Sequence, residues 1–150
     1  MYTGIQISPA PNAADTMAAE RHSPYQSRGL RVLIAEDNPV NQRLAQVLLG
    51  KLGCRVDIAN DGREAVQRVA QCSYDLIFMD CYMPIMDGFE ATTVLRAGET
   101  DGRHLPIIAL TANAMVGDRE RCLAAGIDDY LSKPLRYEEL ASVVRKWGGE

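Results

Sequence analysis

The sequence predicts an α/β fold in which helices wind doubly around a five-stranded parallel sheet, as (βα)5. Five apolar, strand-like runs alternate with five segments of helical length and pattern. The runs 30–35, 75–79 and 106–110 are almost continuously apolar, as expected of parallel strands that helices cover on both faces. Because βαβ crossovers are right-handed, five such units favour the compact, flavodoxin-like strand order 2-1-3-4-5, with a cleft beside the first strand.

Capping residues delimit the first predicted helix. Asn38 is a favoured N-cap and Pro39 suits the first helical position, so a helix begins there. Gly53 is placed to stop this helix in a left-handed conformation. Apolar residues recur between these limits at helical spacing. They predict one buried face, made of Val40, Leu44, Val47, Leu48 and Leu52.

Turn-forming residues separate the later elements in the same way. After the first helix, strands and helices are expected to alternate over 54–59, 63–71, 75–79, 89–96, 106–110, 113–124, 129–132 and 137–147. The last helix carries apolar residues on one side. It is therefore expected to face the core with Leu140, Val143, Val144 and Trp147.

The first 28 residues differ in composition from the rest. Pro9, Pro11 and Pro24 interrupt a run of small and polar residues that contains few large apolar side chains. Such a segment buries too little surface to offset the entropy lost on ordering. We therefore expect residues 1–28 to be a flexible tail or interdomain linker, and residues 29–150 to form one folded domain.

The bulk composition excludes several classes of protein. At 150 residues with 47% hydrophobic and 24% charged residues, the chain suits one water-exposed globular domain. A net charge of −4 gives no electrostatic reason to expect nucleic-acid binding. No apolar stretch approaches the roughly 20 residues of a membrane helix, so we expect no membrane contact and a cytoplasmic location. Four cysteines without a CxxC pair suggest neither a zinc site nor a disulfide framework.

Residues suited to phosphoryl chemistry follow four of the predicted strands. Glu36 and Asp37 follow the first strand, Asp80 the third, Thr111 the fourth and Lys133 the fifth. Because the carboxyl ends of parallel strands share one edge of a sheet, these residues are expected to meet in one cleft. Three acids, a hydroxyl and an amine suit a hard cation together with a phosphoryl group.

The chain resembles the receiver domain of two-component response regulators over about residues 30–147. The resemblance rests on the order and separation of four motifs, which are VLIAEDN at 32–38, MDCYMPIMDG at 79–88, ALTA at 109–112 and YLSKP at 130–134. Residues 38–42 and 128–135 look most like receivers carried by hybrid sensor histidine kinases. The resemblance implies that residues 29–150 are a phosphoacceptor domain.

Asp80 is the expected nucleophile, since a carboxylate can attack the phosphorus of a phosphohistidine and form an acyl phosphate. Mg²⁺ prefers oxygen ligands, and Mn²⁺ could substitute for it. By similarity, Asp37, Asp80 and the carbonyl of Tyr82 would bind the ion directly, and Glu36 through water. The alternative is that Asp80 only caps a turn and that the other two acids are solvated beside a helix start.

Lys133 would neutralise charge on the incoming phosphoryl oxygens, and its peptide bond to Pro134 is expected to be cis by resemblance. The resemblance also implies that the Thr111 hydroxyl binds a phosphoryl oxygen and that Tyr130 then turns inward. Each has an ordinary alternative: a loop cation, a β-branched strand residue and a half-buried aromatic. His104 and His22 are expected to be solvated, and Cys81 to be a small buried hydrophobe.

The resulting prediction is a phosphorelay receiver that is loaded by a histidine kinase core or by a histidine phosphotransfer domain. Its own activity would be at most self-phosphorylation and self-dephosphorylation. A free-standing single-domain regulator is an alternative, whereas the length leaves no room for a DNA-binding output domain. A metal-dependent phosphatase would need a second acid where Tyr82 stands, and a mononucleotide carrier would not place Glu36 and Asp37 in its phosphate loop.

Overall fold

The computed structural model describes residues 29–100, 102–112 and 116–148. Strands and helices alternate through them, as β2 (Arg31–Ala35), α1 (Pro39–Lys51), β3 (Arg55–Ala59), α2 (Gly62–Gln71), β4 (Leu76–Asp80), α3 (Gly88–Ala97), β5 (Ile107–Thr111), α4 (Val116–Ala125), β6 (Asp129–Ser132) and α5 (Tyr137–Trp147). All paired strands are parallel, in the order β3-β2-β4-β5-β6. The predicted fold and strand order 2-1-3-4-5 are therefore confirmed.

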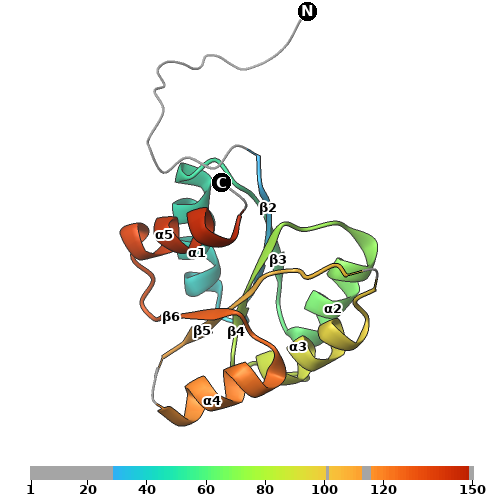
Figure 1. The fold of residues 1–150 in the computed structure, drawn as a ribbon. Helices are drawn as coiled ribbons and strands as arrows, with labels where there is room; N and C mark the ends of the chain where they lie inside the picture. Colours follow the sequence, from blue (N-terminus) through green and yellow to red (C-terminus); the bar gives the residue numbers. More distant parts are fainter. Residues whose placement is uncertain (1–28, 101, 113–115, 149–150) are drawn as a thin grey trace, which may run out of the picture.

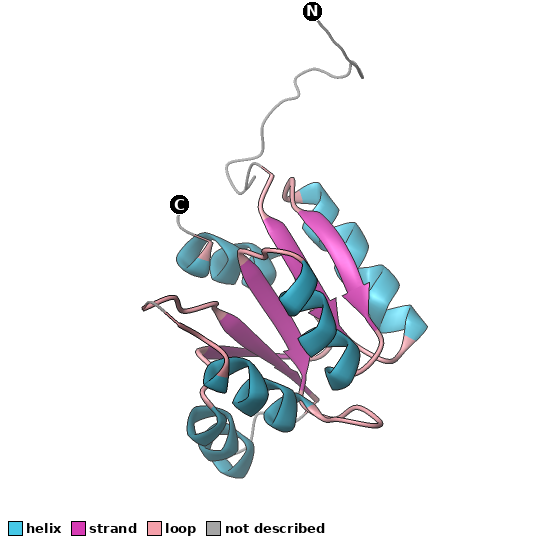
Figure 2. Cartoon of the chain, turned by 90° about the vertical axis from the view of Figure 1, so that its right-hand side faces the viewer, coloured by secondary structure: helices cyan, strands magenta, loops and turns pink. Residues whose placement is uncertain are grey.

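Helices cover the sheet on both faces. Figure 1 shows α1 and α5 on one side, and α2, α3 and α4 on the other, and the turned view in Figure 2 shows the twisted sheet between them. The chain crosses from one face to the other around β2 and β4, which are neighbours in the sheet. Their carboxyl ends therefore border the point at which the strand order reverses.

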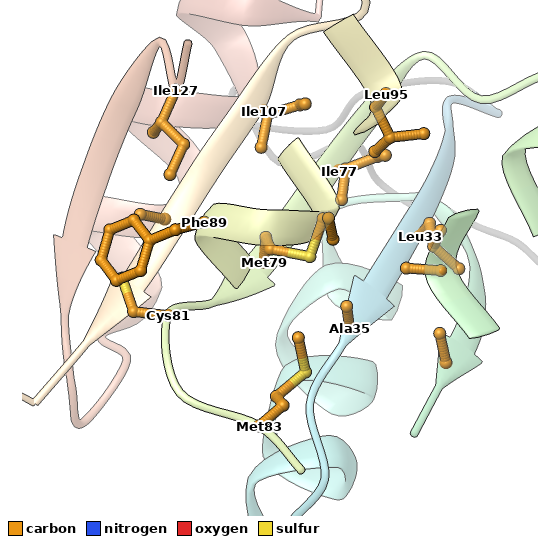
Figure 3. Close-up of a cluster of buried hydrophobic side chains, with 14 of the residues drawn as sticks. Leu33, Ala35, Ile77, Met79, Cys81, Met83, Phe89, Leu95, Ile107 and Ile127 are labelled. Carbon is orange, nitrogen blue, oxygen red and sulfur yellow. The ribbon is translucent and has the colours of Figure 1, made fainter. Parts of the chain in front are cut away.

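The side chains of each central strand alternate between two cores, because successive residues of a strand point to opposite faces. In β2, Val32 and Ile34 pack under α1 and α5, whereas Leu33 and Ala35 pack under the opposite helices. Figure 3 shows the second of these cores, in which Met79 lies near the centre. Burial on both faces explains why these strands read as continuous apolar runs.

Caps fix where the helices nearest the site begin and end. The Asn38 side chain accepts hydrogen bonds from the backbone N–H groups of Val40 and Asn41, and Gly53 has a φ of 85°, both as predicted. Asp87 and Glu90 form a reciprocal capping box at the start of α3. These caps set the directions in which the chain leaves β2 and β4.

The predicted buried face of α1 is wrong in part. Val40, Leu44 and Val47 are exposed, whereas Leu52 is buried and Leu48 partly buried as predicted. Ala45 and Leu49, which were not predicted, complete the buried face. Apolar side chains cover two adjacent stripes of this helix, and the sheet buries only the stripe that includes the small Ala45. By contrast, α5 buries Leu140, Val143 and Val144 as expected, with Trp147 partly buried.

Strand limits differ from the expected ones by about one residue. Asp80 and Thr111 are the last residues of β4 and β5, because the parallel ladders still pair Asp80 with Leu110 and Thr111 with Ser132. The expected helix start near Asn113 and the tail at 1–28 lie outside the described residues. Among the residues described, no helix combines the length and the apolar character needed to cross a membrane.

Candidate functional site

Three acids meet at the carboxyl ends of β2 and β4. These strands are neighbours in register, with Ala35 opposite Met79, so the residues that follow, Glu36 and Asp80, come out side by side. One carboxylate oxygen each from Glu36, Asp37 and Asp80 lies within 4.8 Å of the others. Glu36 and Asp80 are buried, whereas Asp37 is exposed at the mouth of the site.

Lys133 reaches the same acids from the end of β6. Its Nζ lies 2.9 Å from Glu36 Oε1 and 2.9 Å from Asp80 Oδ2. Burial by itself would lower the pKa of Lys133, but the adjoining Glu36 and Asp80 carboxylates outweigh it and raise the pKa above the usual lysine value. The site thus holds a firmly protonated ammonium beside the acids. The Lys133–Pro134 peptide bond is cis, as expected.

The loop that carries Glu36 and Asp37 is anchored from two neighbouring elements. Gln42 of α1 donates its amide N–H to the Glu36 carbonyl oxygen at 2.6 Å and to Asn60 Oδ1 at 2.8 Å. The backbone N–H of Asn38 donates to Glu36 Oε2 at 3.1 Å. Because these bonds fix the backbone and one carboxylate oxygen, Glu36 has little freedom to leave the site.

The acids and their surroundings fit a hard divalent cation. Glu36 Oε1 is buried and has no hydrogen-bond partner of acceptable geometry among the described residues, although Lys133 lies at ion-pair distance. Three carboxylates also face one ammonium, which leaves surplus negative charge. Oxygen ligands with a net negative charge are what Mg²⁺ prefers. This donor set is therefore suited to such an ion.

The loop after β4 passes close to the acids. The backbone N–H of Tyr82 donates to Asp80 Oδ1 at 3.3 Å. A Cβ on Gly88 would collide with the Asp80 carbonyl oxygen, so glycine is required for the loop to return against the strand. Cys81 is fully buried, and this burial, together with the neighbouring Cys122, raises the pKa of its thiol. It is a small buried hydrophobe, as expected.

The two predicted switch residues lie on β5 and β6. Thr111 is buried, and its hydroxyl donates to Asp118 Oδ2 of α4 at 3.3 Å. Tyr130 is half-buried, with the Arg119 guanidinium 5.5 Å from its ring centre. Asp118 is absent from the residues predicted from the sequence. The signal that could have found it is an acid in the first turn of the helix after Thr111.

The Tyr82 side chain lies outside the acid cluster. Its hydroxyl donates to Asp118 Oδ1 at 3.0 Å, and this bond is the main cause that raises the pKa of Tyr82. The ring packs edge-on against Phe89, with the ring centres 5.7 Å apart. The structure thus brings Glu36, Asp37, Asp80 and Lys133 together. Thr111 and Tyr82 are linked at the rim through Asp118.

Comparison with known proteins decides the family. A family model described as the response regulator receiver domain matches residues 32–145. The chain belongs to the response regulator receiver domain family. The resemblance predicted from the four motifs is therefore confirmed, and the protein is a receiver domain of two-component signal transduction.

Related receivers include several carried by sensor kinases. The chain is 41% identical over 162 residues to the sensor protein GacS of Pseudomonas syringae pv. syringae, an alignment that covers 99% of the chain and 18% of that protein. It is 48% identical, with a TM-score of 0.75, to the crystal structure of the receiver domain of the Pseudomonas aeruginosa sensor histidine kinase PA1611, covering 81% of this chain and 99% of that one. That structure has a magnesium ion coordinated in the active site cleft.

A third receiver comes from a complex. The chain is 32% identical, with a TM-score of 0.74, to a chain of a co-crystal structure from Saccharomyces cerevisiae, covering 81% of this chain and 90% of that one. That structure contains the histidine phosphotransfer protein Ypd1 and the receiver domain of the response regulator Ssk1. The first three curated relatives are much longer than this receiver, which spans 18%, 4% and 14% of their lengths. One of these three relatives is named a hybrid signal transduction histidine kinase, of Dictyostelium discoideum, so the likeness to receivers of hybrid kinases is confirmed for this region.

Proposed function

We propose that this receiver is a phosphorelay phosphoacceptor, in which Asp80 takes a phosphoryl group from a phosphohistidine. The observation that carries the proposal is the meeting of Glu36, Asp37 and Asp80 within 4.8 Å, with the Lys133 ammonium 2.9 Å from Asp80. This arrangement offers a carboxylate nucleophile, a charge surplus for a cation and a fixed positive charge for phosphoryl oxygens.

In the proposed step, a carboxylate oxygen of Asp80 forms a bond to phosphorus while the phosphorus–nitrogen bond of the phosphohistidine breaks. The electron pair of that bond stays on the imidazole nitrogen, and Asp80 becomes an acyl phosphate. Lys133 stays protonated and attracts the transferred oxygens, which is positioning and charge neutralisation rather than proton transfer. Transfer to a histidine phosphotransfer partner is the reverse step, and hydrolysis delivers the group to water.

The ion that fits the site is Mg²⁺, for which Mn²⁺ could substitute. Asp37, Asp80 and the Tyr82 carbonyl would hold it, and Glu36 would act through water. When bound, the ion supplies positive charge that offsets the acids and the phosphoryl oxygens. The surplus negative charge of three acids that share one ammonium supports this assignment. Because Glu36 is anchored by Gln42 and Asn38, the acids stay arranged for the ion at little further cost in ordering.

Phosphorylation would be reported through Thr111 and Tyr130. The Thr111 hydroxyl would donate to a phosphoryl oxygen and draw the chain after β5 inward, and Tyr130 would turn toward the space left behind. The burial of Thr111 and the partial burial of Tyr130 on the adjacent strand support this coupling. The change is a shift between two conformations that a local charge event biases.

The proposed partner is a histidine kinase core or a histidine phosphotransfer domain. Val40 is 76% exposed at the start of α1, and Leu44 on the same face is also exposed. A recess beside them is lined by Asn41, Pro134 and Leu135 and reaches Lys133. An apolar surface beside Lys133, which itself contacts Asp80, suits a helical partner whose histidine must approach Asp80.

Within a larger assembly, residues 29–150 would be the receiver and 1–28 a tail or linker, located in the cytoplasm. Whether this receiver acts alone or within a hybrid kinase changes its partner but leaves the chemistry of Asp80 the same. A metal-dependent phosphatase is less well supported, since Tyr82 occupies the place of the second acid and its hydroxyl binds Asp118.

Labelling with a small acyl phosphate donor and Mg²⁺ tests the proposal. The receiver is expected to gain one phosphoryl group by intact-mass spectrometry, and Asp80→Asn is expected to gain none. Asp75→Asn is the matched control, because it makes the same change at the opposite end of β4. Full labelling of Asp80→Asn would exclude Asp80 as the phosphoacceptor.

A further inference from the structure

Asp118 adds a side-chain connection between two parts of the site, the end of β5 and the loop after Asp80, whose backbones already meet in the β4–β5 ladder. It lies in the first turn of α4, and its two carboxylate oxygens have different partners. Oδ2 accepts from the Thr111 hydroxyl at 3.3 Å, and Oδ1 accepts from the Tyr82 hydroxyl at 3.0 Å. One side chain therefore holds both the end of β5 and the loop after Asp80.

The Tyr82 side of this connection is braced. Arg121, almost one turn further along α4, places its guanidinium 4.0 Å from the centre of the Phe89 ring and one nitrogen 3.4 Å from the Tyr82 hydroxyl. The Tyr82 ring in turn meets Phe89 edge-on. These contacts place the Tyr82 hydroxyl against Asp118 Oδ1, while Asp118 Oδ2 meets the Thr111 hydroxyl.

We propose that Asp118 is a positioning residue that holds the Thr111 hydroxyl in the resting receiver and competes with the phosphoryl group for its proton. A hydroxyl carries a single proton, so a Thr111 hydroxyl that donates to Asp118 must give up that bond to donate elsewhere. This inference rests on the proposed function of Asp80 and Thr111. It adds that Asp118, on α4, competes with the phosphoryl group for the Thr111 hydroxyl.

The geometry suits a restraint that can be released. At 3.3 Å the bond from Thr111 is long for a hydroxyl donor, so it contributes less than a short bond to a carboxylate would. When Thr111 turns to a phosphoryl oxygen, Asp118 keeps its bond from Tyr82 but loses the link to β5. Asp118 then keeps its bond to the loop after Asp80. By reciprocity, a partner that draws α4 away from Thr111 favours phosphorylation.

The test combines a substitution with a matched control on the same helix. Asp118→Asn removes the charge while keeping the shape, and Glu120→Gln makes the same change at an exposed position of α4. We expect Asp118→Asn to be labelled by an acyl phosphate donor about threefold faster than Glu120→Gln, which is the lower range for one hydrogen bond. In a Thr111→Val background the Asp118 substitution is expected to add nothing.

A second measurement needs no phosphodonor. The same four combinations of Asp118 and Thr111 are compared for their free energies of unfolding, and a non-zero coupling between the two residues is expected in the unphosphorylated protein. Asp118→Ser serves if Asp118→Asn does not fold. If Thr111→Val prevents labelling, the unfolding measurements alone test whether Asp118 and Thr111 are coupled.

Three results would overturn the proposal: labelling of Asp118→Asn at or below the control rate, acceleration that persists without the Thr111 hydroxyl, or zero coupling in the unfolding cycle. A different result would refute the proposed function instead. In that case Asp118 and Thr111 are coupled, but the Asp80→Asn variant is labelled as well as the unsubstituted receiver. The two failures can therefore be told apart.

Discussion

The two edges of the sheet carry ionic clusters built on opposite principles. The amino-edge cluster consists of Arg96, Glu99, His104 and Asp128, and lies where β5 and β6 begin. The carboxyl-edge site consists of Glu36, Asp37, Asp80 and Lys133. Both bring acids together with cations from distant parts of the sequence. They differ in whether the charges and hydrogen bonds are satisfied.

The amino-edge cluster is saturated. Asp128 Oδ2 accepts from Arg96 at 2.7 Å and from the Ile107 backbone N–H at 2.8 Å, and Oδ1 lies 2.6 Å from His104 Nε2. Arg96 also donates to Glu99 at 2.6 Å and to the carbonyl oxygens of Leu105 and Gly126. Such a network ties α3 to the starts of β5 and β6, and its role is stability.

The carboxyl-edge site keeps surplus negative charge. Three acids share one ammonium, which lies 2.9 Å from an oxygen of each of the two buried acids, Glu36 and Asp80. Surplus charge at a largely buried site is costly, and proteins keep it mainly where function needs it. The two clusters therefore differ in how fully their charges are balanced, and not in the kinds of residue that form them. Removing an acid should therefore destabilise the amino-edge cluster but should stabilise the carboxyl-edge site when no divalent ion is present.

The largest effect is expected at the amino-edge cluster. Asp128→Ala removes the partner of Arg96 and of the Ile107 N–H, both largely buried, so the free energy of unfolding should fall by about 3 kcal/mol. Labelling of the folded fraction with an acyl phosphate should be unchanged. Urea denaturation measures the first quantity, with the exposed Glu120→Ala as control. If Asp128→Ala lowered the free energy of unfolding by less than Glu120→Ala does, this network would not be structural.

The second-largest effect is expected from Mg²⁺, whose stabilisation of the fold should depend on acids at the carboxyl edge and not on an acid at the amino edge. At ten times its dissociation constant, Mg²⁺ is expected to raise the free energy of unfolding of the receiver by about 1.4 kcal/mol, since it binds only the folded chain. Asp37→Asn should lose this stabilisation, because it removes a ligand. Asp75→Asn, at the amino end of β4, should keep it. Thermal unfolding with and without Mg²⁺ gives the comparison, and equal stabilisation of Asp37→Asn would exclude Asp37 as a ligand.

Partner contact should depend on the carboxyl edge alone. Val40→Asp places a charge on the exposed start of α1 and is expected to slow transfer from a phosphorylated histidine phosphotransfer domain about fivefold, roughly 1 kcal/mol. Val94→Asp makes the same change at an exposed valine of α3 and should leave transfer within experimental error. Labelling by a small donor should be normal in both. Equal slowing by the two variants would argue against docking at α1.

The fold and the carboxyl-edge site could be predicted because their signals are local. Each site residue directly follows or ends an apolar run, and parallel strands place those positions at one edge. The strand order, the cis peptide bond before Pro134 and the meeting of Glu36, Asp37 and Asp80 were all expected and are present. Strand ends were missed by about one residue, because ladder pairing rather than hydropathy decides them.

The amino-edge cluster and Asp118 could not be predicted in the same way. His104 is exposed, as expected, but its Nε2 also lies 2.6 Å from Asp128, and spacing alone gives no signal for a contact between residues 24 positions apart. Asp118 reads as an ordinary helix-start acid until the distance to Tyr82, 36 residues away, is known. The exposed stripe of α1 was misassigned because spacing identifies an apolar face but not the surface that covers it.

The smallest expected effect tests the charge surplus directly. Asp37→Asn should raise the free energy of unfolding by about 0.5 kcal/mol in the absence of divalent ions, because it relieves repulsion in an exposed part of the site. Added salt should reduce the gain, since screening already weakens that repulsion in the unsubstituted receiver. Urea denaturation at low and high ionic strength, in chelator, measures both. A loss of stability on removing this acid would mean that Asp37 is satisfied within the fold, and the contrast between the two edges would then not hold.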